Sequence, residues 1–160
     1  MACAESRAAR LAEKARLLAR EGNYQEAIAA LRRVEGEFGT TSVAQDAQKQ
    51  LLLYRGLLDA KLKEERRQAK DDLWALARGL FEYRERWKRY PARLAELDPG
   101  GSLPSLDPWG SDYLYRPSAD GRGYRLQCLG SDGVPGGSGD DVDLVVINGE
   151  FVKDLPWEDR

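Results

Sequence analysis

Residues 129–143 read LGSDGVPGGSGDDVD, and the interpretation of the whole second half of the chain depends on this stretch. Five of its 15 residues are glycine and four are aspartate. Both residue types favour turns, because glycine adopts positive φ without strain and the aspartate side chain bonds to nearby backbone groups. The stretch therefore predicts a long acidic loop over residues 130–143.

Short apolar segments on both sides of this loop predict strands. Residues 113–116 and 124–129 precede the loop and are separated by the turn sequence DGRG. Residues 144–147 follow the loop and are joined to residues 150–153 by Asn-Gly, the dipeptide typical of a type I′ hairpin turn. Together these segments predict a small antiparallel sheet.

Helical patterns dominate the chain before this sheet. Apolar residues recur at helical spacing in four segments, residues 6–21, 24–38, 41–58 and 71–87. The last helix is expected to cover the sheet, with Trp74, Phe81 and Trp87 in the core between them. Residues 60–70 alternate Glu and Arg, which favours a solvated connecting helix over a nucleic-acid contact. The predicted fold class is α+β, with helices first and a long helix packed on a small antiparallel sheet.

The composition of the 160-residue chain narrows the function classes. The chain has no histidine, which excludes Ser-His-Asp and Cys-His catalysis and His-ligated zinc. Residues 1–97 hold 20 Lys+Arg and 15 Asp+Glu, whereas residues 98–160 hold 5 and 12, so the two halves carry opposite net charge. No apolar run approaches the roughly 18 residues that a membrane span needs. Cys3 is a candidate lipid anchor, although the apolar stretch that acylation requires upstream is missing.

Residues 22–28, GNYQEAI, resemble the turn and second-helix start of a tetratricopeptide repeat. Ala15, Ala27 and Leu31 stand where that pattern has small or apolar groups. Gly39 stands where the repeat usually has proline, and only about one and a half repeat units fit. An ordinary helical hairpin is the alternative interpretation. Because solenoids normally need three or more repeats, this segment is expected to lean on a neighbour or to cap one.

Several short motifs occur in a fixed order over about residues 71–148. They are FEY at 81–83, RYP at 89–91, DPWG at 107–110, the tyrosines at 113 and 115, and the acidic loop at 129–143. A lone DPWG would be weak evidence, but the complete series is specific. In this order and spacing the motifs closely resemble the globular domain of the major pseudopilin of type II secretion systems, the G family.

This resemblance implies a calcium site in the acidic loop. The ligands that carry over are the side chains of Asp132, Asp140 and Asp143, with the carbonyls of Leu129 and Pro135 as weaker candidates and Asp141 as a substitute. Calcium takes six to eight oxygen ligands in irregular geometry, which suits clustered carboxylates among glycines. The alternative is a mobile acidic loop that binds nothing. Against it, clustered carboxylates repel one another, and a cation removes that penalty.

Members of that family begin with a prepilin peptidase site and an apolar N-terminal helix, and neither occurs here. The chain is thus expected to join a tetratricopeptide-like module, residues 1–60, to a pseudopilin-like head, residues 61–160. The alternative is the trimmed part of an anchored protein.

The resemblance implies a non-enzymatic, calcium-binding component of the bacterial cell envelope, periplasmic or extracytoplasmic. Its partners would be other proteins of a secretion or pilus-like machinery, with no nucleic acid and no membrane span. One alternative is a general adaptor in which residues 1–70 bind a peptide or protein and the sheet is an appendage. Another is a hydrolase whose aspartates hold a catalytic metal, but no convincing general base or nucleophile accompanies them.

Overall fold

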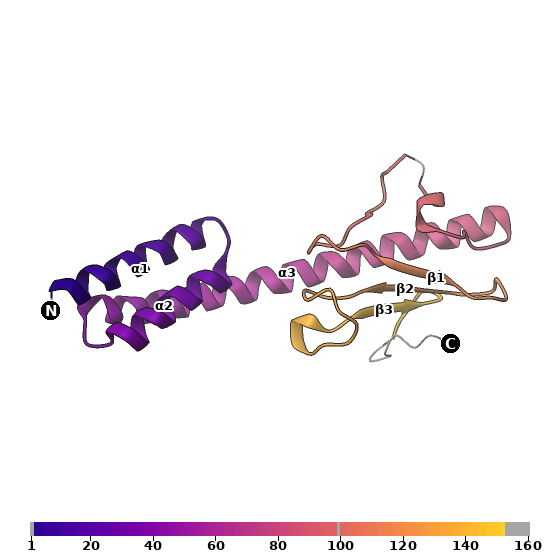
Figure 1. The fold of residues 1–160 in the computed structure, drawn as a ribbon. Coiled ribbons are helices and arrows are strands. Elements are labelled where there is room, and N and C mark those ends of the chain that lie inside the picture. Colours follow the sequence, from indigo (N-terminus) through magenta and orange to yellow (C-terminus); the bar gives the residue numbers. More distant parts are fainter. Residues whose placement is uncertain (1, 99, 153–160) are drawn as a thin grey trace. The chain divides into compact units, whose positions relative to one another are not determined.

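The computed structural model describes residues 2–98 and 100–152, apart from the side chains of Ala2 and Asp140. The chain divides into two compact units, Met1–Leu62 and Lys63–Arg160 (Figure 1). One long helix, α3 (Ser42–Trp87), contributes residues to both units. Each unit has a hydrophobic core of its own.

The first unit contains α1 (Ala2–Arg20), α2 (Tyr24–Phe38) and the first part of α3. Gly22, at φ +80°, ends α1 in a Schellman motif: its N–H donates to the Ala19 carbonyl, and the Asn23 N–H donates to the Leu18 carbonyl at 2.9 Å. The core consists mainly of small side chains, which let the helices approach closely, and its members are Ala8, Ala15, Ala27, Ile28, Ala30, Leu31, Val34, Ala44, Ala47, Leu51 and Tyr54. The tetratricopeptide likeness of this unit stays a prediction.

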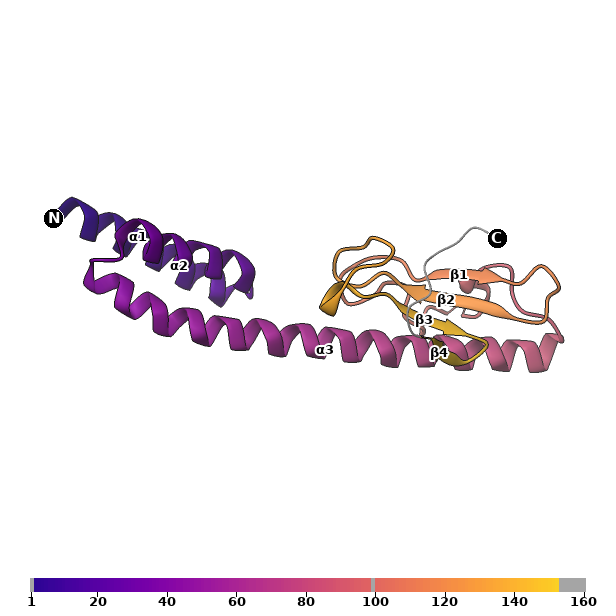
Figure 2. The same cartoon turned by 90° about the horizontal axis from the view of Figure 1, so that it is seen from below.

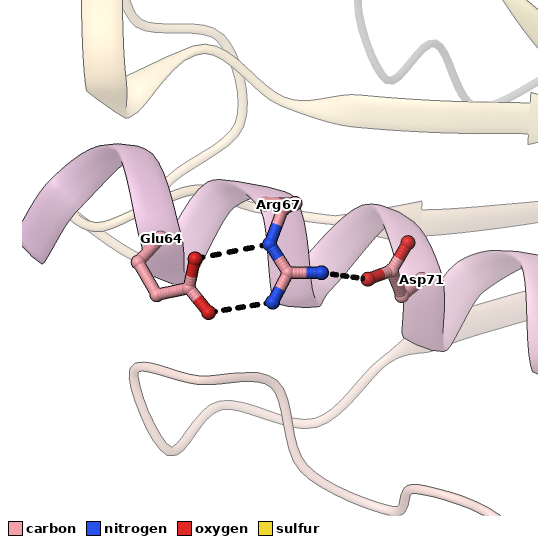
Figure 3. A network of polar contacts seen from close by, with 3 residues as sticks. All are labelled: Glu64, Arg67 and Asp71. Atoms are coloured by element: carbon pink, nitrogen blue, oxygen red, sulfur yellow. Dashed lines mark hydrogen bonds and ion pairs between the residues drawn. The ribbon is translucent and has the colours of Figure 1, made fainter.

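Helix α3 is continuous over 46 residues, so the segments 41–58 and 71–87, predicted as two helices, form one, and the prediction of a connecting helix over residues 60–70 is confirmed. The intervening charged segment has good helix formers and no Gly or Pro, and nothing in it interrupts the helix. Arg67 lies between two carboxylates on this segment, 2.6 Å from Glu64 and 2.6 Å from Asp71 (Figure 3). These pairs are exposed, so they support the helix only modestly.

The second unit packs the C-terminal part of α3 against a four-stranded antiparallel sheet (Figure 2). The strands follow chain order and are β1 (Leu114–Pro117), β2 (Tyr124–Cys128), β3 (Leu144–Ile147) and β4 (Glu150–Val152). In the central pair, Leu126 of β2 lies opposite Val146 of β3. Asn148 and Gly149 join β3 to β4 with φ of 53° and 91°, as a type I′ turn requires.

The core of this unit lies between one face of α3 and alternate residues of the strands. The helix contributes Ala69, Leu73, Leu76, Ala77 and Leu80, and the sheet contributes Tyr124, Leu126, Cys128, Leu144 and Val146. The two sets follow the helical and strand periods, respectively.

The prediction that three aromatic residues of α3 belong to this core is wrong. Trp74, Phe81 and Trp87 are 52%, 60% and 56% exposed. Trp74 and Phe81 each follow a fully buried leucine, and one residue turns the side chain by about 100° around the helix, away from the sheet. Trp74 instead meets Phe151 of β4 edge-to-face, with ring centroids 5.4 Å apart.

Candidate metal-binding loop

The acidic loop connects the two central strands, β2 and β3, and contains a short 3₁₀ helix, η2 (Gly139–Asp141). Two of its glycines are required by close packing as well as by positive φ. A Cβ on Gly137 would lie 2.3 Å from the Asp141 carbonyl oxygen, and one on Gly130 would lie 2.7 Å from the same atom. The loop therefore folds back on itself in a shape that larger residues cannot adopt at these positions.

Asp143, at the end of the loop, carries the most unusual polar group of the site. Its Oδ2 accepts hydrogen bonds from Gln127 Nε2 at 2.6 Å and from the Gly136 N–H at 3.1 Å. Its Oδ1 is buried and has no hydrogen-bond partner. A buried carboxylate oxygen without a partner costs free energy, which a cation at that position would remove.

The other predicted ligands are distributed along the loop. Asp132 Oδ1 accepts from the Val134 N–H at 3.0 Å and closes a local turn, while the Asp141 carboxylate accepts from the Ser131 hydroxyl. The Asp140 side chain lies outside the described part of the structure. Leu129 directly follows β2, and Pro135 lies in the exposed middle of the loop. Among the described side chains, no three or more Asp, Glu, Cys or His gather into a group that could hold a metal ion.

Side chains of α3 tie the loop and its surroundings to the helix. Arg66 Nη1 donates to the carbonyl of Val142, the residue before Asp143, at 2.9 Å. The Trp109 indole N–H donates to Glu65 Oε2 at 3.1 Å, one position earlier on the helix. The end of the loop is thus anchored to a rigid element, which limits the positions that Asp143 can take.

The DPWG motif forms a tight turn next to the loop. Asp107 is 5% exposed, and its Oδ1 accepts from the backbone N–H groups of Trp109 and Ser111 at 3.0 and 2.8 Å. Its Oδ2 accepts a weak hydrogen bond from the Cys128 thiol at 3.4 Å. Burial raises the pKa of that thiol to about 12, so Cys128 stays protonated near neutral pH.

A protein-family model covers the part of the chain that contains this site. Residues 57–147 match the model described as type II secretion system protein G. The chain belongs to this family. The match begins on α3 and ends with β3, so it includes the acidic loop and the DPWG turn. The resemblance predicted from the motif order is confirmed.

A curated member of the protein G family gives the same result. The type II secretion system core protein G of Xanthomonas campestris pv. campestris is 35% identical over 88 residues, which cover 48% of this chain. The matched region spans 62% of that relative's own length. Within residues 2–98 and 100–152, no helical segment has the length and hydropathy of a bilayer span.

The donor chemistry of the loop fits calcium better than a soft metal. The candidate ligands are carboxylate and carbonyl oxygens, histidine is absent from the sequence, and the neighbouring thiol of Cys128 is protonated and bonded to Asp107. Among the described candidate ligands, Asp143 Oδ1 is the buried oxygen without a hydrogen-bond partner, and a bound cation would supply one. A bound calcium ion would neutralise the loop carboxylates. Asp143 would be one of its ligands, held in place by the hydrogen bond from Gln127 of β2.

Sequence reasoning missed two residues that shape this site, Gln127 and Arg66. Gln127 is completely buried within β2, and a glutamine inside an otherwise apolar strand was the available signal. Arg66 lies 76 positions before the carbonyl to which it donates, in a segment that reads as a uniformly solvated helix. Nothing in the local sequence distinguishes Arg66 from the arginine that follows it.

Proposed function

We propose that this chain is a non-enzymatic assembly component of the type II secretion machinery in the bacterial cell envelope, with a calcium-stabilised protein G head. Family membership supports the secretion role. The observation that carries the calcium site is the buried Asp143 Oδ1 without a partner, within a loop of oxygen donors. Calcium would hold the loop between β2 and β3 in one shape, from which the head docks onto other proteins.

The use that the structure makes of its acidic residues supports an architectural role. Asp107 and Asp132 accept backbone N–H groups in tight turns, and Asp141 accepts a serine hydroxyl. These contacts organise the backbone, as expected of a loop that recognises a partner by its shape. We therefore propose that these aspartates stabilise the backbone of the turns and take no part in catalysis.

The first unit gives the chain a second surface for a partner. Residues 1–56 lie outside the family match, and the described part of this segment folds around a core of its own. We assign this unit the role of a module that binds another protein of the secretion machinery. A general adaptor, in which the helical unit alone carries the binding function, is the second candidate, and the separate core of this unit favours it.

Calorimetric titration of the full chain with calcium tests the head. We expect one site with a Kd of roughly 10⁻⁴ to 10⁻³ M, as in extracellular calcium modules, and much weaker heat with magnesium. The matched control is Asp120→Asn, in the β1–β2 turn, which should bind like the parent. A parent chain that gives no binding heat over this range would refute the calcium site.

Photocrosslinking in cells that contain a type II secretion system tests the assembly role. A photoreactive residue replaces Leu53 of the helical unit, which is 58% exposed, or Phe151 of the head, which is 37% exposed. Crosslinks to secretion-system proteins from either position support the proposal. Crosslinks from Leu53 alone favour the adaptor, and products that contain no secretion-system protein from either position refute the assembly role.

A further inference from the structure

A groove in the helical unit has the chemistry of a peptide-binding site. Its larger cavity is an open depression of about 340 Å³ among Arg16, Ala19 and Arg20 of α1, Tyr24 of α2, and Gln50, Tyr54 and Leu57 of α3. A smaller cavity of about 120 Å³ shares Arg16 and Gln50 with it, so the two adjoin along α1 and α3. All lining residues belong to the first unit.

The walls of this groove are apolar and aromatic. Tyr24 and Tyr54 lie with their ring centroids 6.4 Å apart. Leu57 lines the cavity and is 40% exposed, and Leu53, one helical turn earlier, is 58% exposed. Spacing of four residues places both leucines on the same face of α3. Leu53 is not among the lining residues, and together with Leu57 it extends the exposed apolar surface of α3 beyond the groove.

Gln50 supplies an unsatisfied polar group inside the same groove. Its Oε1 is buried and has no hydrogen-bond partner. Buried side-chain amides are normally paired, so this oxygen calls for a donor from outside the unit. The Gln50 side chain has to rotate to present this oxygen in the groove, where a backbone N–H of a bound peptide is such a donor.

The positive charge of two arginines at the larger cavity favours a negatively charged ligand. Arg16 and Arg20 both line the larger cavity, which has no acidic lining residue, whereas the smaller cavity is lined by one acidic residue, Asp46. Arg16 pairs with Glu13 at 3.1 Å, but both side chains are about half exposed, so a ligand carboxylate can exchange for Glu13 at little cost. Two guanidinium groups beside an apolar wall complement a carboxylate next to a bulky apolar side chain.

We propose that this groove binds a short acidic segment of a partner protein, with one bulky apolar side chain in the larger cavity and carboxylates at Arg16 and Arg20. The inference rests on the proposed role of the first unit as a partner-binding module and is independent of calcium. It names the site and the ligand chemistry, which family membership does not address, because the family match begins at residue 57.

Fluorescence anisotropy of the full chain with end-capped, fluorescein-labelled peptides tests the proposal. Each peptide carries a central leucine flanked by aspartates, by lysines or by serines. We expect the aspartate peptide to bind at least about tenfold more tightly than the other two, and its affinity to fall as salt is raised. Repeating the titration with chelator in place of calcium separates the groove from the head, since the result should not change.

Three variants locate the binding. Arg20→Glu should weaken the aspartate peptide by about tenfold or more, and Gln50→Leu should weaken all three peptides without changing their order. Arg32→Glu makes the same charge change on the exposed side of α2 and should bind like the parent. Far-UV circular dichroism and sedimentation velocity check the fold and the oligomeric state of each chain.

The groove is refuted if the three peptides bind equally or not at all, or if Arg20→Glu and Arg32→Glu behave alike. Self-association of the chain without peptide binding would also refute it, because a second copy would then fill the groove. Photocrosslinks from Leu53 to a secretion-system protein, together with rejection of all peptides, would refute the groove and leave the proposed function standing.

Discussion

Replacement of Asp143 by asparagine tests the central claim about the acidic loop. The amide has the shape of the carboxylate, so its oxygen can still accept from Gln127 and Gly136, as Asp143 Oδ2 does at 2.6 and 3.1 Å. The substitution removes the negative charge and replaces the unpartnered Oδ1. It therefore removes the attraction for calcium while keeping most of the loop's internal bonds.

The expected size of the effect follows from binding linkage. With about 10 mM free calcium and a Kd between roughly 10⁻³ and 10⁻⁴ M, binding to the folded state alone adds about 1.4 to 2.7 kcal/mol to the free energy of unfolding. For a unit of about 100 residues this corresponds to a rise in Tm of between about 6 and 20 °C. In chelator, Asp143→Asn should lie within about 1 kcal/mol of the parent, because both side chains can accept from Gln127 and Gly136 and both leave one buried polar atom without a partner.

Tryptophan fluorescence is the appropriate probe of thermal unfolding. All four tryptophans, at positions 74, 87, 109 and 157, follow the boundary between the two units at Leu62. Their fluorescence therefore reports the unfolding of the second unit and not that of the first. The measured quantity is the difference in Tm between calcium and chelator, for the parent, for Asp143→Asn and for the control Asp120→Asn.

The parent and Asp120→Asn should show the full calcium shift, and Asp143→Asn should show almost none. Identical parent Tm values in calcium and in chelator would refute calcium stabilisation of the head. A full shift that persists in Asp143→Asn would refute the assignment of the ion to this carboxylate. A shift that is equally large with magnesium would indicate general charge screening and not a calcium site.

Three further outcomes are expected. Arg66→Gln should weaken calcium binding by roughly 2- to 10-fold, because the bond that anchors the loop end to α3 is lost, and unchanged calorimetric affinity would contradict this. Gly137→Ala should destabilise the head by more than about 2 kcal/mol, because the added Cβ would lie 2.3 Å from the Asp141 carbonyl oxygen. Gly136→Ala places its Cβ in open space and should cost only about 1–2 kcal/mol of backbone strain. Equal denaturant midpoints for the two variants would refute this packing. Burial raises the Cys128 pKa from 9.0 to about 12, so the folded state binds more protons between these values and stability should fall as pH rises through them. Cys128→Ala should reduce this fall, of which the buried tyrosines supply the rest, among them Tyr124, whose pKa burial raises from 10.0 to about 12. Cys3→Ala, at an exposed thiol, is the control.

The elements of the second unit were predictable because each has a local signal. Alternating apolar residues and turn dipeptides place all four strands within one or two residues, and Asn148-Gly149 determines the hairpin through its positive φ values. The family resemblance was recognisable for a related reason. The most specific of its motifs, the acidic loop and the DPWG turn, are segments whose residue types are imposed by the backbone, as Gly130 and Gly137 demonstrate.

Errors arose where the outcome depends on neighbours in space. The period of 3.6 residues identifies an amphipathic helix, but it does not reveal how wide a stripe the small sheet covers, so Trp74, Phe81 and Trp87 were wrongly assigned to the core. The union of two predicted helices into α3 has a different origin, because it follows from the high helix propensity of the charged segment between them, a local signal that already favoured a connecting helix.

For the candidate site, the amino-acid sequence by itself determined the chemistry: a histidine-free loop of aspartates and glycines offers oxygen ligands and little else. Tertiary structure alone decided which oxygen lacks a partner and which distant side chains support the loop. Gln127 occupies one side of Asp143, and Arg66 anchors the loop end from 76 residues away. The Arg66 bond depends on how the helix lies on the sheet, and the Gln127 bond depends on how β2 lies beside the end of the loop, so neither can be read from the local sequence.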